Sequence, residues 1–134
     1  MILPNGTLVA VLDGATMRLF LNKGHDPHVE LVALDTPKLE HESAGSGGRH
    51  RSSTANPDGS RQDEDDFVAA AVAHLNREAL AGRLTHVAII ADPRTLGEMR
   101  RHYGEALSTR LLVEIGKDLA HRPPAEIEAA LRAA

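Results

Sequence analysis

The chain has 134 residues, of which 42% are hydrophobic. This fits one globular domain with a single modest core and excludes a disordered tail, and the absence of cysteine excludes a disulfide framework, a thiolate zinc site and a cysteine nucleophile. The formal net charge of −4, the pI of about 6.0 and the 2% aromatic content argue against a free-standing nucleic-acid binder, which usually has a basic excess and rings for base stacking.

The first third of the chain predicts three short β-strands. Residues 7–12 are β-branched and apolar, and they end at the turn signal Asp13-Gly14. A second apolar run covers 17–21 and a third covers 29–34. Connections as short as those between these runs favour antiparallel pairing, so we expect a three-stranded meander.

Residues 36–62 form a stretch of different composition. It holds four glycines and five serines, and its apolar residues are only one leucine and two alanines. Such a stretch buries too little surface to offset the entropy lost on ordering it, so we expect a flexible polar loop at about 36–62. A loop of this length inside a compact domain is typically either functional or disordered.

The longest helix is predicted over 63–81. Its first turn holds four consecutive acidic residues, which the helix dipole favours, and apolar residues then recur at helical spacing. Gly82 follows as a natural C-terminal stop. Residues 84–91 include a continuous apolar run, which is typical of a central parallel strand buried on both faces.

Three further elements complete the chain. Asp92 before Pro93 predicts the N-cap and the first residue of a helix that ends at Gly104. Alternating apolar residues at 111–115 predict the last strand. Two prolines at 123–124 predict the start of a C-terminal helix.

The predicted order is βββαβαβα in one domain spanning residues 1–134. A three-stranded meander followed by parallel βαβ units is the ribonuclease-H-like arrangement. We therefore expect an α/β fold with a five-stranded mixed sheet of order 3-2-1-4-5 and helices on its faces. The right-handed crossover rule supports placing the fourth strand beside the first.

Several segments spread along the chain carry a family resemblance. They are LPNGT at 3–7, DGA at 13–15, RLF at 18–20, LN at 75–76, ALAG at 79–82, DPRTLGEMR at 92–100 and EIGKDL at 114–119. In their order and spacing they resemble the bacterial host-attachment protein family, and the match spans nearly the whole chain except the polar loop. That family is named for the attachment of plant-associated bacteria to host cells.

The resemblance implies a relationship in fold to the catalytic middle domain of archaeal and eukaryotic peptide-chain release factors. In those factors a glycine-glycine-glutamine loop lies between a strand and a long helix and helps water to release the nascent peptide. Gly47-Gly48-Arg49 lies in the matching loop, with arginine in place of glutamine. A guanidinium has no hydrogen-bond acceptor, so the resemblance implies a ribosome-related ancestry and argues against peptidyl-tRNA hydrolysis.

The first functional hypothesis is therefore a non-enzymatic binding module without a cofactor. Its binding residues would lie in the glycine-rich loop, where cations could contact RNA phosphates of the ribosome or the acidic face of a protein partner. These residues are Gly47, Gly48, Arg49, Arg51 and Arg61. A role in host attachment would then be indirect. With no signal segment and no apolar run long enough for a membrane span, we expect a cytoplasmic location.

The second hypothesis is a metal-dependent hydrolase of the nuclease type. Asp13 and Asp92 would lie together at the carboxyl ends of adjacent parallel strands, where two carboxylates could hold a divalent metal. Such a site needs further acids, and only residues 63–66 offer them. The competing interpretation is structural, with Asp13 in a turn and Asp92 as an N-cap. None of the eight histidines shows metal-ligand spacing, so no metal site is predicted from them.

Two further possibilities stay open. Lys117 and Asp118, at the exit of the last strand, could form a fixed ion pair or contact a ligand at the same polar site. The chain could also act as a protein-protein interaction domain through an exposed edge strand, the third or the fifth.

Overall fold

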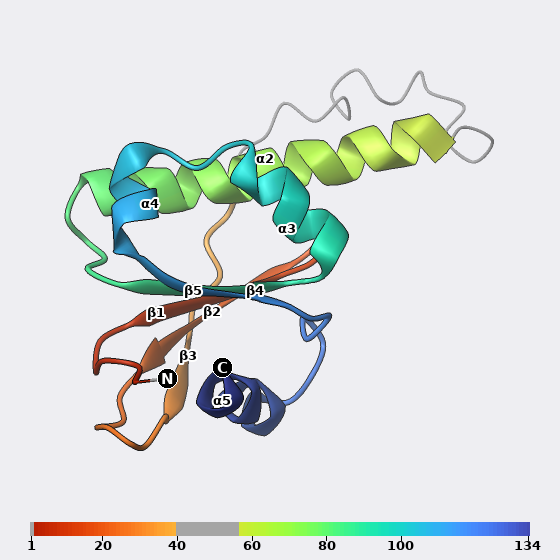
Figure 1. Ribbon diagram of the computed structural model, residues 1–134. Coiled ribbons are helices and arrows are strands. Elements are labelled where there is room, and N and C mark those ends of the chain that lie inside the picture. Colours follow the sequence, from red (N-terminus) through yellow and green to blue (C-terminus); the bar gives the residue numbers. More distant parts are fainter. Residues whose placement is uncertain (1, 40–56) are drawn as a thin grey trace.

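The computed structural model describes residues 2–39 and 57–134 (Figure 1). Within these residues one mixed sheet has the strand order β3-β2-β1-β4-β5, which confirms the predicted order. The strands are β1 (Leu8–Leu12), β2 (Met17–Asn22), β3 (Leu31–Leu34), β4 (Val87–Ala91) and β5 (Leu111–Gly116). The first three strands pair antiparallel, whereas β1, β4 and β5 are parallel to one another.

Helices cover both faces of the sheet, as the sequence predicts. The described helices are α2 (Pro57–Leu80), α3 (Pro93–Arg100), α4 (Glu105–Arg110) and α5 (Pro124–Ala133). Figure 1 shows α2, α3 and α4 on one face and α5 alone on the other. Among the described residues, no helix combines the length and the apolar character needed to span a membrane.

Two hydrophobic cores lie on the two faces of the sheet. Successive side chains of a strand point to opposite faces, so Leu8, Ala10 and Leu12 of β1 belong to the core under α2, while Val9 and Val11 belong to the core under α5. All residues of β1 and β4 are buried, as expected for central strands covered on both faces. The two central strands thereby fix the edge at which their polar C-terminal neighbours emerge.

The boundaries of two elements differ from the sequence-based expectation. The long helix begins at Pro57 and not at residue 63, so residues 57–62 are helical although their composition predicted a loop. Proline is well suited to the first helical position because its fixed φ matches the helix and its missing N–H has no partner there. β3 begins at Leu31 and not at residue 29, because the Glu30 N–H donates to the side-chain oxygen of buried Asn22.

A short helix, α4, was not predicted. Gly104 does not end the preceding helix, which stops at Arg100, but is the N-cap of α4. The Gly104 N–H donates to the Asn76 Oδ1 at 2.8 Å, and Asn76 Nδ2 donates to the His102 carbonyl at 2.9 Å. Only Leu107 of α4 is buried, so six residues give too little periodicity for a helix to be recognised.

Candidate functional site

The carboxyl edge of the parallel strands is where the sequence placed its polar candidates. Asp13 follows β1, Asp92 follows β4 and Lys117 follows β5. The structure brings Asp13 and Asp92 into the lining of one pocket of about 280 Å³. The other residues that line it are Gly14, Ala15, Glu64, Arg94 and Thr95. Such an edge is the usual place for ligands in open α/β sheets.

Asp13 is held in this pocket by the turn between β1 and β2. Its Oδ1 accepts hydrogen bonds from the Ala15 N–H at 2.9 Å, the Thr16 N–H at 2.7 Å and the Thr16 hydroxyl at 2.9 Å. His121 Nε2 lies 3.0 Å from Oδ2, across the sheet edge. Partial burial raises the pKa of Asp13, but the hydrogen bonds outweigh it and the pKa is lowered below its ordinary value. The carboxylate is therefore ionised at neutral pH, and its Oδ1 accepts the hydrogen bonds that hold the turn between β1 and β2.

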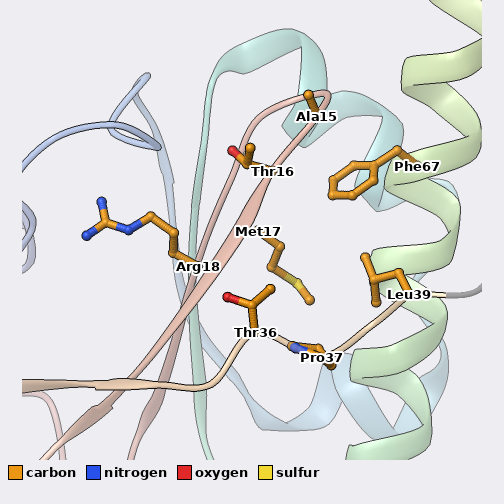
Figure 2. Close-up of a pocket in the computed structure, with 8 residues that line it drawn as sticks. All are labelled: Ala15, Thr16, Met17, Arg18, Thr36, Pro37, Leu39 and Phe67. Atoms are coloured by element: carbon orange, nitrogen blue, oxygen red, sulfur yellow. The ribbon is translucent and has the colours of Figure 1, made fainter.

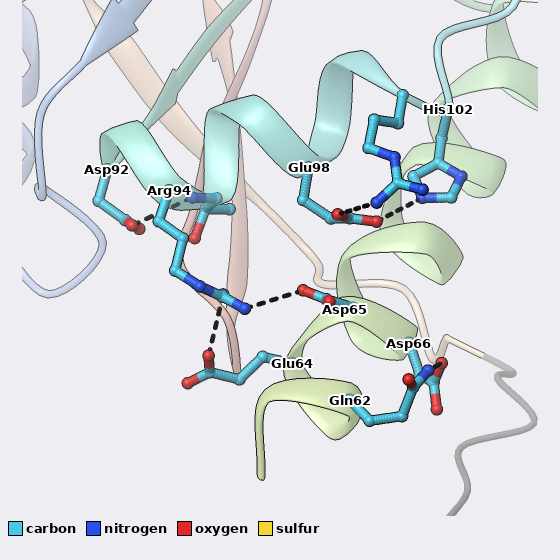
Figure 3. Close-up of polar contacts among 10 residues, drawn as sticks. Gln62, Glu64, Asp65, Asp66, Asp92, Arg94, Glu98 and His102 are labelled. Atoms are coloured by element: carbon cyan, nitrogen blue, oxygen red, sulfur yellow. Dashed lines mark hydrogen bonds and ion pairs between the residues drawn. The ribbon is translucent and has the colours of Figure 1, made fainter. Parts of the chain in front are cut away.

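Asp92 acts as the N-cap of α3, as the structural interpretation of the sequence anticipates. Its Oδ2 accepts a hydrogen bond from the Thr95 N–H at 3.2 Å (Figure 3). Arg94, two residues further on, reaches α2 and forms ion pairs with Glu64 at 3.0 Å and Asp65 at 3.1 Å. The acidic start of the sequence-predicted helix is thus partly neutralised by a cation from α3.

The acids of this pocket do not assemble a metal centre. Within residues 2–39 and 57–134, no group of three or more histidine, aspartate or glutamate side chains is placed to hold a metal ion. Two of the candidate acids, Glu64 and Asp65, are paired with Arg94, and Asp13 and Asp92 each accept backbone donors. The arrangement can cap turns and helices, and it gives little support to metal-dependent hydrolysis.

Lys117 and Asp118 do not join the pocket. Both are exposed after the end of β5. Among the ion pairs of the described residues, none joins Lys117 to Asp118, so the fixed pair considered from the sequence is not formed. Neither residue lines the pocket that holds Asp13 and Asp92.

A second pocket, of about 420 Å³, lies where the described chain leaves β3. Its lining includes Met17 of β2, Phe67 of α2 and, from the segment after β3, Thr36, Pro37 and Leu39. Figure 2 shows Leu39 and Phe67 on the same side of the sheet as the sulfur of Met17, and the guanidinium of a neighbouring arginine on the other side. This apolar contact anchors the chain just before residue 40.

The candidate loop residues lie mainly outside the described part of the chain. Gly47, Gly48, Arg49 and Arg51 fall between residues 40 and 56, which the structure does not describe. Arg61 is exposed on the first turns of α2. What the fold does give is the position of the segment in the topology, since it joins β3 to the long helix α2.

Several polar contacts were not foreseen from the sequence. Arg18 Nη1 donates to the carbonyls of Ala120 at 3.3 Å and Arg122 at 2.6 Å. His121 meets Asp13 from 108 positions away. Contacts between such distant residues have no local sequence signal, because they depend on how the sheet and α5 come together.

A partly buried tyrosine also belongs to a polar cluster on β5. The Tyr103 hydroxyl donates to Glu114 Oε2 at 2.7 Å, and Arg100 donates to Glu114 Oε1 at 2.9 Å. Burial, together with this hydrogen bond, strongly raises the pKa of Tyr103. Partial burial raises the pKa of Glu114, but its bonds to Arg100 and Tyr103 outweigh this and the pKa is lowered. The cluster joins α3 to β5, and none of its residues lines the pocket at Asp13.

One comparison with known proteins identifies a relationship. The family model described as bacterial archaeo-eukaryotic release factor family 12 matches residues 6–131. This range contains all five strands and most of α5. No curated protein matches the chain. The match confirms the relationship to release factors that the sequence motifs predicted.

Proposed function

Since the chain belongs to bacterial archaeo-eukaryotic release factor family 12, we propose that it is a non-enzymatic module that binds ribosomal RNA. The observation that carries this proposal is the sequence Gly47-Gly48-Arg49 in the segment joining β3 to α2. Release factors carry their glycine-glycine-glutamine loop between a strand and a long helix. The proposed contact uses the same place in the topology with a different side chain.

The charge of this segment supports contact with phosphates. Between residues 43 and 57 the only charged side chains are Arg49 and Arg51. Lys38 and Arg61, on the described chain at either side, are exposed. Arginine binds phosphate through a planar fork of donors, and two glycines beside it let the backbone approach closely. The cation excess is confined to residues 43–57, because Glu40, Glu42 and Asp58 offset Lys38 and Arg61 in the flanks. This short basic segment can bind RNA phosphates although the whole chain has a net charge of −4.

The same residues argue against hydrolysis of peptidyl-tRNA. Arg49 stays cationic and has no acceptor with which to orient a water molecule. The two carboxylates that the sequence offers at the strand ends, Asp13 and Asp92, already accept backbone hydrogen bonds. We propose that any role in the attachment of bacteria to host cells is an indirect effect of binding in the cytoplasm.

Co-sedimentation with bacterial ribosomes tests this proposal. One variant replaces residues 40–56 with a glycine-serine linker of equal length, which keeps Leu39 in its pocket and leaves α2 intact. A second variant carries Arg49→Ala and Arg51→Ala. The control carries Arg77→Ala and Arg132→Ala, which remove the same charge from exposed positions on α2 and α5.

The proposal predicts that both loop variants lose most of their ribosome association, while the control retains it. If the wild type and the linker variant associate equally with ribosomes, residues 40–56 do not contribute to ribosome binding and the proposal is wrong. Release of formyl-methionine from programmed ribosomes is measured in parallel, and none is expected. Release by the wild type that is lost on Arg49→Ala would show that the module is catalytic after all.

A further inference from the structure

The two edges of the sheet differ in how well they are protected. β5 carries Glu114 near its middle, held by Arg100 and Tyr103. β3 has the sequence Leu-Val-Ala-Leu, without a charge or a proline. Sheet edges are normally blunted by charged residues, by proline or by a covering segment. Of the two edge strands that the structure describes, β3 is therefore the one suited to accept another strand.

The backbone of β3 leaves hydrogen-bonding groups directed outward. The Lys23 N–H donates to the Glu30 carbonyl at 2.8 Å, which sets the alternation of the β2–β3 ladder. The backbone N–H and C=O groups of residues 32 and 34 then point to β2, whereas those of Leu31 and Ala33 point away from it. Consistent with this, the Leu31 N–H donates to Glu128 of α5 at 2.8 Å. Ala33 presents its N–H and carbonyl outward, and no hydrogen bond to them occurs among the described residues.

The side chains of β3 add an apolar surface beside this edge. Val32 is 45% exposed and Leu34 is 39% exposed, and both point to the face that α2 covers elsewhere. Leu34 lines a pocket of about 420 Å³ together with four other leucines. These are Leu8, Leu19, Leu21 and Leu84. A strand added at β3 would place every second side chain next to Val32 and Leu34, at the mouth of this pocket.

The charges around the strand decide between possible occupants. Glu30 and Asp35 flank β3 and are exposed, and Glu128 lies at Leu31. In the symmetric antiparallel register that pairs Ala33 with Ala33 of a second copy, Leu31 would face Asp35 of that copy. Three carboxylates would then gather at each end of the pair, which is destabilising. The edge therefore disfavours self-pairing and favours a strand with basic ends.

We propose that the edge of β3 is a docking site for an extended segment of another protein. This segment would add a strand to the sheet through Ala33, place alternate apolar side chains beside Val32 and Leu34, and carry lysine or arginine at its ends opposite Glu30 and Asp35. This surface is built from the described residues 30–35 and does not include Arg49 or Arg51 of the proposed RNA contact, so separate variants test the two proposals.

Fluorescence anisotropy with synthetic peptides tests the proposal. The probe is a labelled peptide with a core of alternating valine and threonine and lysines at both ends, and its control has glutamates instead. The wild type is expected to bind the lysine peptide about tenfold more tightly, because opposite charges across strand ends stabilise pairing. Ala33→Pro is expected to weaken this binding about tenfold, since it removes an outward N–H and no bond to β2.

A charge-reversed protein and two structural readouts complete the test. Glu30→Lys with Asp35→Lys should invert the preference between the two peptides. The amide resonances of residues 31–35 should shift on binding, and the dispersion of the spectrum shows that Ala33→Pro is folded. The proposal is overturned if binding does not saturate or if both peptides bind equally. It is also overturned if the amide shifts are confined to residues outside 31–35, or if light scattering shows a stable dimer.

Discussion

At the scale of single residues, the carboxylates beside the strand ends serve the backbone. Asp13 accepts three hydrogen bonds at one oxygen, and Asp92 caps the next helix. Each keeps a short polar segment folded at the edge of the sheet. Side chains in these positions can be mistaken for catalytic acids, because the same residue types at the same edge also bind metals in other proteins.

The first prediction concerns Asp13. Replacing it with alanine removes the oxygen that accepts three hydrogen bonds in the turn. We therefore expect Asp13→Ala to lower the free energy of unfolding by about 1–2 kcal/mol at neutral pH. The pKa of Asp13 is lowered in the folded chain from its ordinary value of 3.8. The ionised carboxylate therefore stabilises the fold at pH values above 3.8, and this stabilisation is lost as the pH falls through the lower pKa of the folded state. Urea unfolding at neutral and acidic pH measures the difference.

Asp118→Ala serves as the matched control, because Asp118 is exposed and makes no ion pair in the described structure. Its effect should stay within about 0.5 kcal/mol at either pH. Millimolar Mg²⁺ or Mn²⁺ should leave the unfolding midpoint of the wild type unchanged. A rise in the midpoint that Asp13→Ala abolishes would contradict the capping account and revive the metal site.

At the scale of elements, α2 is the connector of the fold. Besides packing on the sheet, it receives Arg94 from α3 at its N-terminal half, and it offers Asn76 to the connection between α3 and α4. Asn76 satisfies a carbonyl at one end of that connection and an N–H at the other. A single amide thus fixes the path of the chain where only a histidine and a tyrosine lie between the C-cap of α3, Arg101, and the N-cap of α4, Gly104.

The second prediction follows from this contact. Asn76→Ala would leave the His102 carbonyl and the Gly104 N–H, both partly buried, without their partner. We expect a loss of about 1–3 kcal/mol in the free energy of unfolding. Gln62→Ala on the same helix removes only an exposed hydrogen bond to Asp66 and should change stability by less than about 0.5 kcal/mol. Equal losses in thermal unfolding of the two variants would contradict the role of Asn76.

The elements also show what the sequence can predict. The strand order follows from short connections, from fully apolar central runs such as Val87–Ala91 and from the handedness of crossovers, all of which are local or general. The start of α2 at Pro57 was missed because glycine and serine there suggest a loop, yet the first turns continue a helix that packs further along the chain. α4 was missed because only one of its residues is buried.

At the scale of the whole molecule, the chain order puts Gly47-Gly48-Arg49 in the segment that joins β3 to α2. Sequence reasoning brought Asp13 and Asp92 to one pocket, because the carboxyl ends of adjacent parallel strands must meet. It could not foresee that His121 would reach Asp13 or that Arg94 would bridge to α2, since these contacts depend on the packing of distant helices. The polar side chains at this edge serve the fold, and the proposed RNA contact is the segment before α2.

The salt dependence of ribosome binding tests this assignment most directly. Each phosphate contact made by a cation releases counterions, so the logarithm of the affinity falls with the logarithm of the salt concentration in proportion to the number of contacts. Loss of two contacts in the variant with Arg49→Ala and Arg51→Ala should reduce the slope by about 1.5, while the variant with Arg77→Ala and Arg132→Ala keeps the slope of the wild type. An unchanged slope in the first variant would contradict the account.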